Sequence, residues 1–247
     1  MRPSRRAYAL LGAFACLLIA LPARADTYAE APSGDAPMQD STPDTNFGTA
    51  TDYCGQIGGN RWHAFLTFDL SSIPSGSTIS SATLKLTPVE GQTNSVINFY
   101  SLLKYATEDG ETWNKYDGTN AWATAGGGSG TDYDADLIGT VTLDGSGSYT
   151  FAIATSTISA WVNGTKTNDG IFCKAADEGS TNYIAAGSRE HATPSSRPLL
   201  TVEYTVSSST PPTTPTSTTQ IVVVESASGL ITVFLLSFMC FVLVWKR

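Results

Sequence analysis

The 247-residue sequence predicts an all-β protein: a β-sandwich of jelly-roll type with one short helix, followed by a C-terminal transmembrane helix. Three observations predict this. Short segments in which apolar and polar residues alternate recur between polar, glycine-containing loops, which is typical of sandwiches. A single segment has helical spacing. The chain ends in a long uncharged apolar run.

The N-terminal residues 1–25 have the pattern of a signal peptide. Three arginines precede the apolar run AYALLGAFACLLIALP, and Ala23-Arg24-Ala25 is the small-x-small pattern that signal peptidase accepts. The run is shorter than the roughly 20 residues of a spanning helix, which disfavours an uncleaved anchor. We therefore expect the mature chain to begin at Asp26.

Two half-buried strands are predicted in residues 61–70 and 79–88. In the first, every even-numbered residue is apolar and the odd-numbered residues are polar, with Phe65 as the exception. This alternation places His63 on the polar face, so we expect it at the surface. Pro74 lies in the polar link between the strands and favours a turn there. Further strands are expected at 28–30, 96–105, 138–143, 148–154, 170–175, 182–187 and 199–206.

The one helical segment is TSTISAWVNG, residues 155–164. Ile158, Trp161 and Val162 have the i, i+3, i+4 spacing of an apolar helix face, so Trp161 is expected in the core. Thr155 or Ser156 can cap the start of the helix, and the glycine at its end can stop it. We expect this helix to cover one end of the sandwich.

The C-terminal part predicts a stalk and an anchor. Residues 207–228 are rich in Ser, Thr and Pro, which suits an extended and O-glycosylated stalk. Residues 229–245 are uncharged and apolar, and the basic tail 246–247 is expected in the cytoplasm. A lipid anchor attached after cleavage near Ser226 is the alternative. Both place residues 26–206 on the extracellular side of the cell surface, as a single-pass membrane-anchored or lipid-anchored domain.

Charge and cysteine content point to the same location. The chain has a net charge of −8, and six of its fourteen basic residues lie outside residues 26–206, so this domain is more acidic still. Such a surface disfavours nucleic acids, whose phosphates require basic partners. Cys54 and Cys173 would form a disulfide that closes a loop of about 120 residues in an oxidising exterior. Two buried thiols that never meet are the alternative.

Seven motifs carry a family resemblance. In chain order they are DTYAEAP, PDTNFGTATDY, FLTFDLSSIPSGSTISSATLKL, TWNKYDGTNAW, WVNGT with NDGIF, SRE, and RPLLTVEYTV. Over nearly all of residues 26–206 the chain resembles DNRLRE-type surface domains, a group similar to the family 96 carbohydrate-binding modules. The resemblance implies a β-sandwich on secreted bacterial or archaeal proteins, with alginate-like glycans as ligands of some members. Arg61, Arg189 and Glu190 match family positions and could face a ligand; an Arg–carboxylate pair that fastens the last strand is the alternative.

The stretch TWNKYDGTNAW is the predicted carbohydrate-binding loop, because flat aromatic faces suit sugar C–H surfaces and amide or carboxylate groups suit hydroxyls. Its expected contact residues are Trp113, Asn114, Tyr116, Asp117, Asn120 and Trp122. A structural role of the two tryptophans, closing one end of the sandwich, remains open.

Other chemistry is sparse. In TDYDAD, the alternating Asp132, Asp134 and Asp136 would lie on one side of an extended segment and could bind calcium; a solvated loop is the alternative. Asn163 begins the one N-glycosylation sequon of the domain. His63 and His191 are the only histidines, and no nucleophile elbow or phosphate loop is present in the sequence.

The sequence therefore predicts a non-catalytic carbohydrate-binding or adhesion protein, tethered to the membrane, whose partner is an extracellular or cell-envelope polysaccharide. A structural cell-envelope protein that self-associates is the alternative. A polysaccharide-active enzyme is a lesser one, because two suitably spaced carboxylates would suffice for glycoside hydrolysis.

Overall fold

The computed structural model describes residues 25–91, 94–145, 147–206, 224–225 and 231–232. The chain divides into two compact units, Met1–Ser207 and Ser208–Arg247. In the second, β13 (Val224–Glu225) pairs with β14 (Ile231–Thr232). The predicted signal peptide up to residue 24, most of the predicted stalk and transmembrane segment, and the basic tail lie outside the described residues. Among the residues that are described, no helix combines the length and hydropathy needed to cross a membrane.

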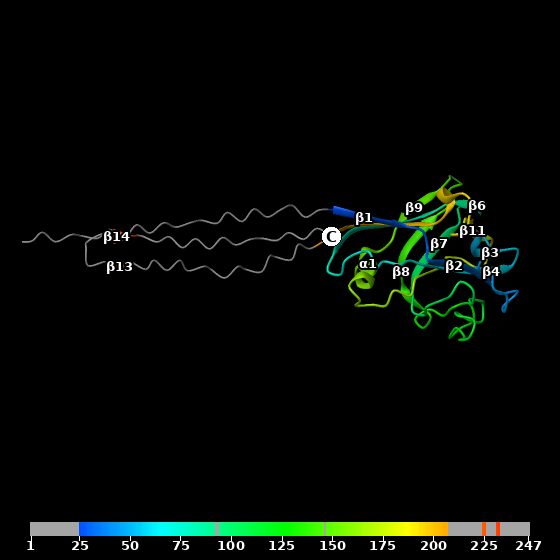
Figure 1. The fold of residues 1–247 in the computed structure, drawn as a ribbon. Coiled ribbons are helices and arrows are strands. Elements are labelled where there is room, and N and C mark those ends of the chain that lie inside the picture. The colour runs from blue at the N-terminus through cyan, green and yellow to red at the C-terminus, as the bar shows by residue number, and fades with distance from the viewer. Residues whose placement is uncertain (1–24, 92–93, 146, 207–223, 226–230, 233–247) are drawn as a thin grey trace, which may run out of the picture. The chain divides into compact units, whose positions relative to one another are not determined.

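The first unit is built from two antiparallel sheets and one short α-helix, as the sequence predicts (Figure 1). The smaller sheet has the order β1-β12-β5-β9. Its strands are β1 (Ala25–Glu30), β5 (Thr78–Leu86), β9 (Tyr149–Ala152) and β12 (Leu199–Thr205).

The larger sheet has the order β6-β11-β3-β4-β10-β7-β8, and β2 also pairs with β4. Its strands are β2 (Gly34–Gln39), β3 (Asp52–Ile57), β4 (Asn60–Thr67), β6 (Pro88–Gly91), β7 (Val96–Leu102), β8 (Tyr133–Thr142), β10 (Ile171–Ala175) and β11 (Asn182–Ala186).

The main core lies between the two sheets. Leu84 of β5 and Leu200 of β12, from the smaller sheet, share one buried cluster with Leu66 of β4 and Phe99 of β7 from the larger. In each of these strands the alternate residues turn inward, which is the periodicity that the sequence shows. The result is a sandwich-like fold.

A second core covers the outer face of the larger sheet and was not predicted. The loop of residues 103–132 between β7 and β8, green in Figure 1, folds beside β2 and β4. Its Trp113 and Trp122 form a buried cluster with Phe65 of β4 and Phe172 of β10. This explains why Phe65 breaks the alternation of its strand. The prediction that His63 lies at the surface is wrong, because the loop buries this face as well: His63 is only 4% exposed.

The sequence pattern missed β2, β3 and β6. Gly34 and Pro37 interrupt the apolar pattern of β2, and Gly55 interrupts β3. Gly55 has φ of 125°, and a side chain there would collide with the backbone of Asn182 on β11. Only glycine tolerates this backbone conformation and close approach at no cost. The residue that interrupts the apolar pattern is therefore the one that lets β3 pair with β11.

The predicted helix is present as α1 (Thr155–Val162), with Ile158 and Trp161 buried in the main core. The predicted caps are wrong at the start: Ala154 is the N-cap and no side chain caps the helix. At the other end the chain turns through Asn163 into Gly164, whose φ is 67°, as expected for a glycine that ends a helix.

Cys54 of β3 and Cys173 of β10 meet in the main core, but as free thiols, so the predicted disulfide is not formed in the structure. Burial raises the pKa of Cys54 well above its usual range, and its hydrogen bond with Cys173 adds to the shift. Because oxidation proceeds through the thiolate, the raised pKa of the buried Cys54 thiol disfavours bridging.

Glu111 lies near Trp113 in the loop of residues 103–132, which we call the covering loop. It is fully buried, and its carboxyl group accepts no hydrogen bond within the described residues. Burial raises its pKa well above the ordinary value of 4.5, with a smaller effect of Cys173. A neutral carboxylic acid is therefore the form that the fold accommodates.

Glu111→Gln is expected to raise the free energy of unfolding at pH 7 by about 1 to 3 kcal/mol. In the folded state the Glu111 carboxyl keeps a proton that the unfolded state has lost above pH 4.5, so the free energy of unfolding of the native protein falls as the pH rises. The glutamine side chain does not titrate, so the variant should not show this fall. Urea unfolding at pH 4 and pH 7 measures the effect, with Glu30→Gln on exposed β1 as the control. A variant less stable than the native protein at pH 7 would contradict the assignment.

Candidate functional site

A groove lies between the chain that follows β4 and the helix α1. It has a volume of about 620 Å³, within the range of small-ligand sites. Its floor is apolar and its rim is polar. The lining residues are Ser33, Thr67, Phe68, Asp69, Leu70, Ser71, Ile73, Ser75, Tyr105, Trp161, Val162 and Asn168.

Two aromatic side chains line the groove. Tyr105, which follows β7, is 57% exposed. Trp161 is 6% exposed, and its buried Nε1–H has no hydrogen-bond partner among the described residues. A buried donor without a partner costs free energy. Asn168 is held at the rim by a 2.8 Å bond from Nδ2 to the carbonyl of Phe68.

A second hollow of about 290 Å³ continues the groove. The two share Ser33, Asp69 and Ser71 in their linings. In the second, the buried hydroxyl of Tyr28 also has no partner among the described residues. Burial, with Glu30 and Asp69 nearby, raises the pKa of Tyr28 to about 12, so the hydroxyl stays a neutral donor.

Asp69 supplies the matching acceptor. The side chain and backbone N–H of Ser71 hydrogen-bond its carboxylate and lower its pKa, so it stays ionised. The joined hollows thus combine the exposed Tyr105, the oriented carboxylate of Asp69, and Trp161 and Tyr28, whose buried donors have no partner among the described residues. No lysine or arginine lines either hollow. This combination suits an elongated neutral molecule rich in hydroxyls and disfavours an anionic one.

The aromatic residues of the predicted binding loop lie elsewhere. Trp113 and Trp122 are each 5% exposed, and Trp122 donates from Nε1 to the carbonyl of Thr112 at 3.0 Å. Tyr116 is half-buried with its ring against Trp122. In this structure neither tryptophan presents a face to solvent, and both serve the second core.

The polar residues of that loop hold its own turns. Asp117 accepts hydrogen bonds from the backbone N–H groups of Thr119 and Asn120 and from the Asn120 side chain, which together lower its pKa. Asn114 donates to Asp44 at 2.9 Å. These bonds shape the loop and leave few free groups for a ligand.

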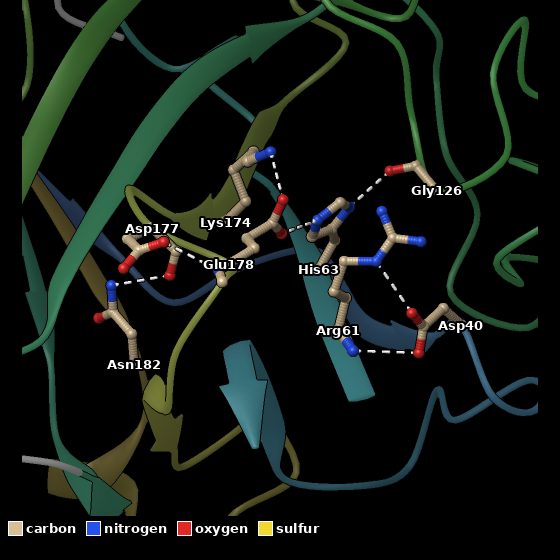
Figure 2. Close-up of polar contacts among 9 residues, drawn as sticks. Asp40, Arg61, His63, Gly126, Lys174, Asp177, Glu178 and Asn182 are labelled. Atoms are coloured by element: carbon tan, nitrogen blue, oxygen red, sulfur yellow. Dashed lines mark hydrogen bonds and ion pairs between the residues drawn. The ribbon is translucent and has the colours of Figure 1, made fainter. Parts of the chain in front are cut away.

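His63 of β4 anchors the loop through the carbonyl of Gly126, and Arg61 of the same strand bonds Asp40, which follows β2, as Figure 2 shows. The ring nitrogens of His63 lie 2.6 Å from the carbonyl oxygen of Gly126 and 2.5 Å from Glu178 Oε1. Both partners present acceptor oxygens to the ring, so the geometry suits donation from both ring nitrogens. The Arg61 guanidinium lies 5.1 Å from the centre of the Trp113 ring, and its Nε donates to Asp40 at 2.9 Å.

Glu178 completes this buried ion pair. Its burial alone would raise its pKa, but the hydrogen bond and charge of His63, with those of Lys174, lower it to about 2. Lys174 Nζ lies 2.7 Å from Glu178 Oε2. The Glu178 carboxylate is therefore ionised across the physiological pH range. Through its bond to His63 it helps to hold the loop at Gly126.

The three predicted calcium ligands are not brought together. Asp132 is buried and accepts from the backbone N–H groups of Ala123, Thr124 and Gly128, so it closes the turn before β8. Asp134 pairs with Lys166 at 3.0 Å. Asp136 is exposed on β8.

Arg189 lies in a different acidic cluster. Its Nε is 2.6 Å from Glu108 Oε2 and 2.6 Å from Glu190 Oε1, and its backbone N–H donates to Asp35 at 2.8 Å. Burial raises the pKa of Asp35 to about 6 and that of neighbouring Asp52 well above its usual range. This supports the interpretation of Arg189 as an ion-pairing residue.

Asn163, the predicted glycosylation site, is half-buried. Its Oδ1 accepts from the backbone N–H of Gly76 at 2.6 Å and its Nδ2 donates to Ser159. Glycosylation there remains a prediction.

Fold and hollows together define a two-sheet all-β module with a groove beside α1. The sequence model of the disaggregatase related repeat domain matches residues 35–202, most of the described part of the first unit. The chain belongs to this family of surface repeat domains. None of the curated proteins compared with it matches.

The groove residues were missed for an identifiable reason. Trp161 was correctly predicted as core, but periodicity cannot show that its Nε1 remains unpaired. Tyr105 lies at the end of the predicted strand 96–105, next to the exposed Leu103. Two exposed large apolar residues so close together were the one available signal.

Proposed function

We propose that this protein is a non-catalytic carbohydrate-binding or adhesion protein of the cell surface, with a sandwich of jelly-roll type, and that its groove binds a neutral extracellular or cell-envelope polysaccharide. The observation that carries the proposal is the exposed ring of Tyr105 above a groove whose buried Trp161 Nε1–H lacks a partner. Rings stack on sugar C–H faces, and free donors bind sugar hydroxyls.

The same proposal includes the signal peptide, the stalk and the membrane tether, which rest on the sequence of both ends. It extends the resemblance to family 96 carbohydrate-binding modules, but with a different ligand surface from the loop at 112–122. The acidic lining of the groove favours a neutral glycan over an alginate-like one, because like charges repel.

The test is binding of the full chain to an array of neutral and anionic glycans. We expect a neutral polysaccharide to bind, and Tyr105→Ala to weaken that binding about tenfold or more, a change of about 1.4 kcal/mol. Leu137→Ala removes a similarly exposed apolar side chain of β8 outside the groove and should leave binding unchanged.

Other outcomes would contradict the proposal. Concentration-dependent self-association with a blank array would favour the structural envelope protein. Release of shortened products from a polysaccharide panel would favour an enzyme.

A further inference from the structure

Four carboxyl groups meet where separate parts of the fold come together, away from the groove lining: Asp35 and Asp52 are buried, Glu108 is half-buried and Glu190 is exposed. Oxygens of Asp35 on β2, Glu108 in the covering loop and Glu190 after β11 lie within 4.8 Å of one another. Ligands on opposite sides of a calcium ion are about 4.8 Å apart, because Ca–O distances are about 2.4 Å. The three groups thus have the spacing of a calcium ligand set.

Asp52 of β3 adds an independent observation. It is 6% exposed, and its side chain contacts that of Asp35. Its side chain hydrogen-bonds that of Asp35, and apart from this contact between two carboxyl groups neither of its oxygens, nor Asp35 Oδ1, has a partner among the described residues. Buried carboxylates are normally paired or bind a metal.

The local charges are unbalanced. Arg189 contacts Glu108 and Glu190 and is the one cation in ion-pair contact with the cluster among the described residues. One guanidinium does not neutralise the carboxylates of Glu108 and Glu190 together with the buried Asp35–Asp52 pair, and the protein as a whole carries a net charge of −8. All of the ligand atoms are oxygens, which suits a hard cation and not zinc.

A path to solvent is also present. A hollow of about 300 Å³ is lined by Glu108 and Arg189 together with Asn46, Gly48, Thr49 and Asp109. It brings water, and hence further oxygen ligands, to the edge of the cluster. Calcium commonly completes its six to eight ligands with water and carbonyl oxygens.

We propose that Asp35, Asp52, Glu108 and Glu190 bind a calcium ion. The ion joins β2, β3, the covering loop and the segment after β11, four parts of the chain that are distant in sequence. Its role is structural, so it is independent of glycan binding in the groove. It also replaces Asp132, Asp134 and Asp136 as the calcium site of this domain.

The experiment uses the full chain, freed of metal with a chelator and titrated with CaCl2 by calorimetry. We expect one site, with Kd of about 10⁻⁴ M or tighter, and a rise of several degrees in Tm at 10 mM CaCl2. Asp52→Asn should remove both effects. Asp136→Asn, the same substitution at an exposed aspartate of β8, should keep both.

Glu190→Gln, on the outer side of the cluster, serves as a second variant should Asp52→Asn fail to fold, and it should weaken binding about tenfold or more. No heat of binding and no change in Tm with the native protein would overturn the proposal. So would undiminished binding by Asp52→Asn and Glu190→Gln, or loss of binding in Asp136→Asn. If the native chain still binds glycan in the presence of the chelator, the groove is a site separate from the calcium site.

Discussion

Trp113→Ala is expected to lower the free energy of unfolding by about 3 to 5 kcal/mol, the usual cost of removing a large aromatic side chain from a core. The ring is 5% exposed, lies 4.8 Å from the His63 ring and packs in the second core with Phe65 and Phe172. It also closely covers Gly126, where φ is 81° and any side chain would collide with the indole. Denaturant unfolding at pH 7 measures the loss.

Tyr105→Ala is the control for that experiment. Its ring is 57% exposed, so its loss should change stability by no more than about 0.5 kcal/mol. A Trp113→Ala variant that keeps its stability but loses glycan binding would show that the tryptophan is a ligand contact and that the second core is not what holds the loop.

Glu178→Ala is expected to cost about 3 kcal/mol at pH 7, because removing one partner of a buried ion pair leaves the other charge uncompensated. The side chain of His63 is 5% exposed and would keep only the Gly126 carbonyl as a partner among the residues drawn (Figure 2). Lys174 would lose its partner as well. Guanidinium unfolding at pH 7 measures the loss.

The cost should depend on pH. Glu178 has a pKa of about 2 in the folded protein against an ordinary value of 4.5, so its contribution is complete above pH 4.5 and is lost as the pH falls toward 2. The native protein and Glu178→Ala should therefore converge in stability below pH 3. Asp177→Ala, which removes the neighbouring exposed carboxylate of a local turn, should leave stability close to that of the native protein. Equal stability of native protein and Glu178→Ala at pH 7 would contradict the ion pair.

Much of the sandwich was predictable, because the strands that form the main core alternate cleanly. In β5 and β12 the inward-facing residues include Leu84, Leu86, Leu200 and Val202, as the period of two predicts. The pattern failed at β2 and β3, because Gly34, Pro37 and Gly55 interrupt the apolar alternation and have low β-strand propensity.

The sites were harder to predict, because they depend on which segments cover which faces. Phe65 signalled a second buried face, but nothing local shows that residues 103–132 fold over it. Tryptophans in a polar loop have the same composition whether they stack on a sugar or fill a core. Asp35, Asp52, Glu108 and Glu190 are spread over more than 150 positions, so only the fold brings them together.

The central claim is that the groove beside α1, and not the aromatic loop, recognises carbohydrate. The most direct test follows the indole N–H resonances of the chain by NMR during titration with the neutral glycan found on the array. The account predicts that Trp161, whose Nε1–H is free, shifts on binding, while Trp122, already bonded to Thr112, does not. A shift of Trp122 or Trp113 with Trp161 unchanged would place the ligand on the loop and contradict the account.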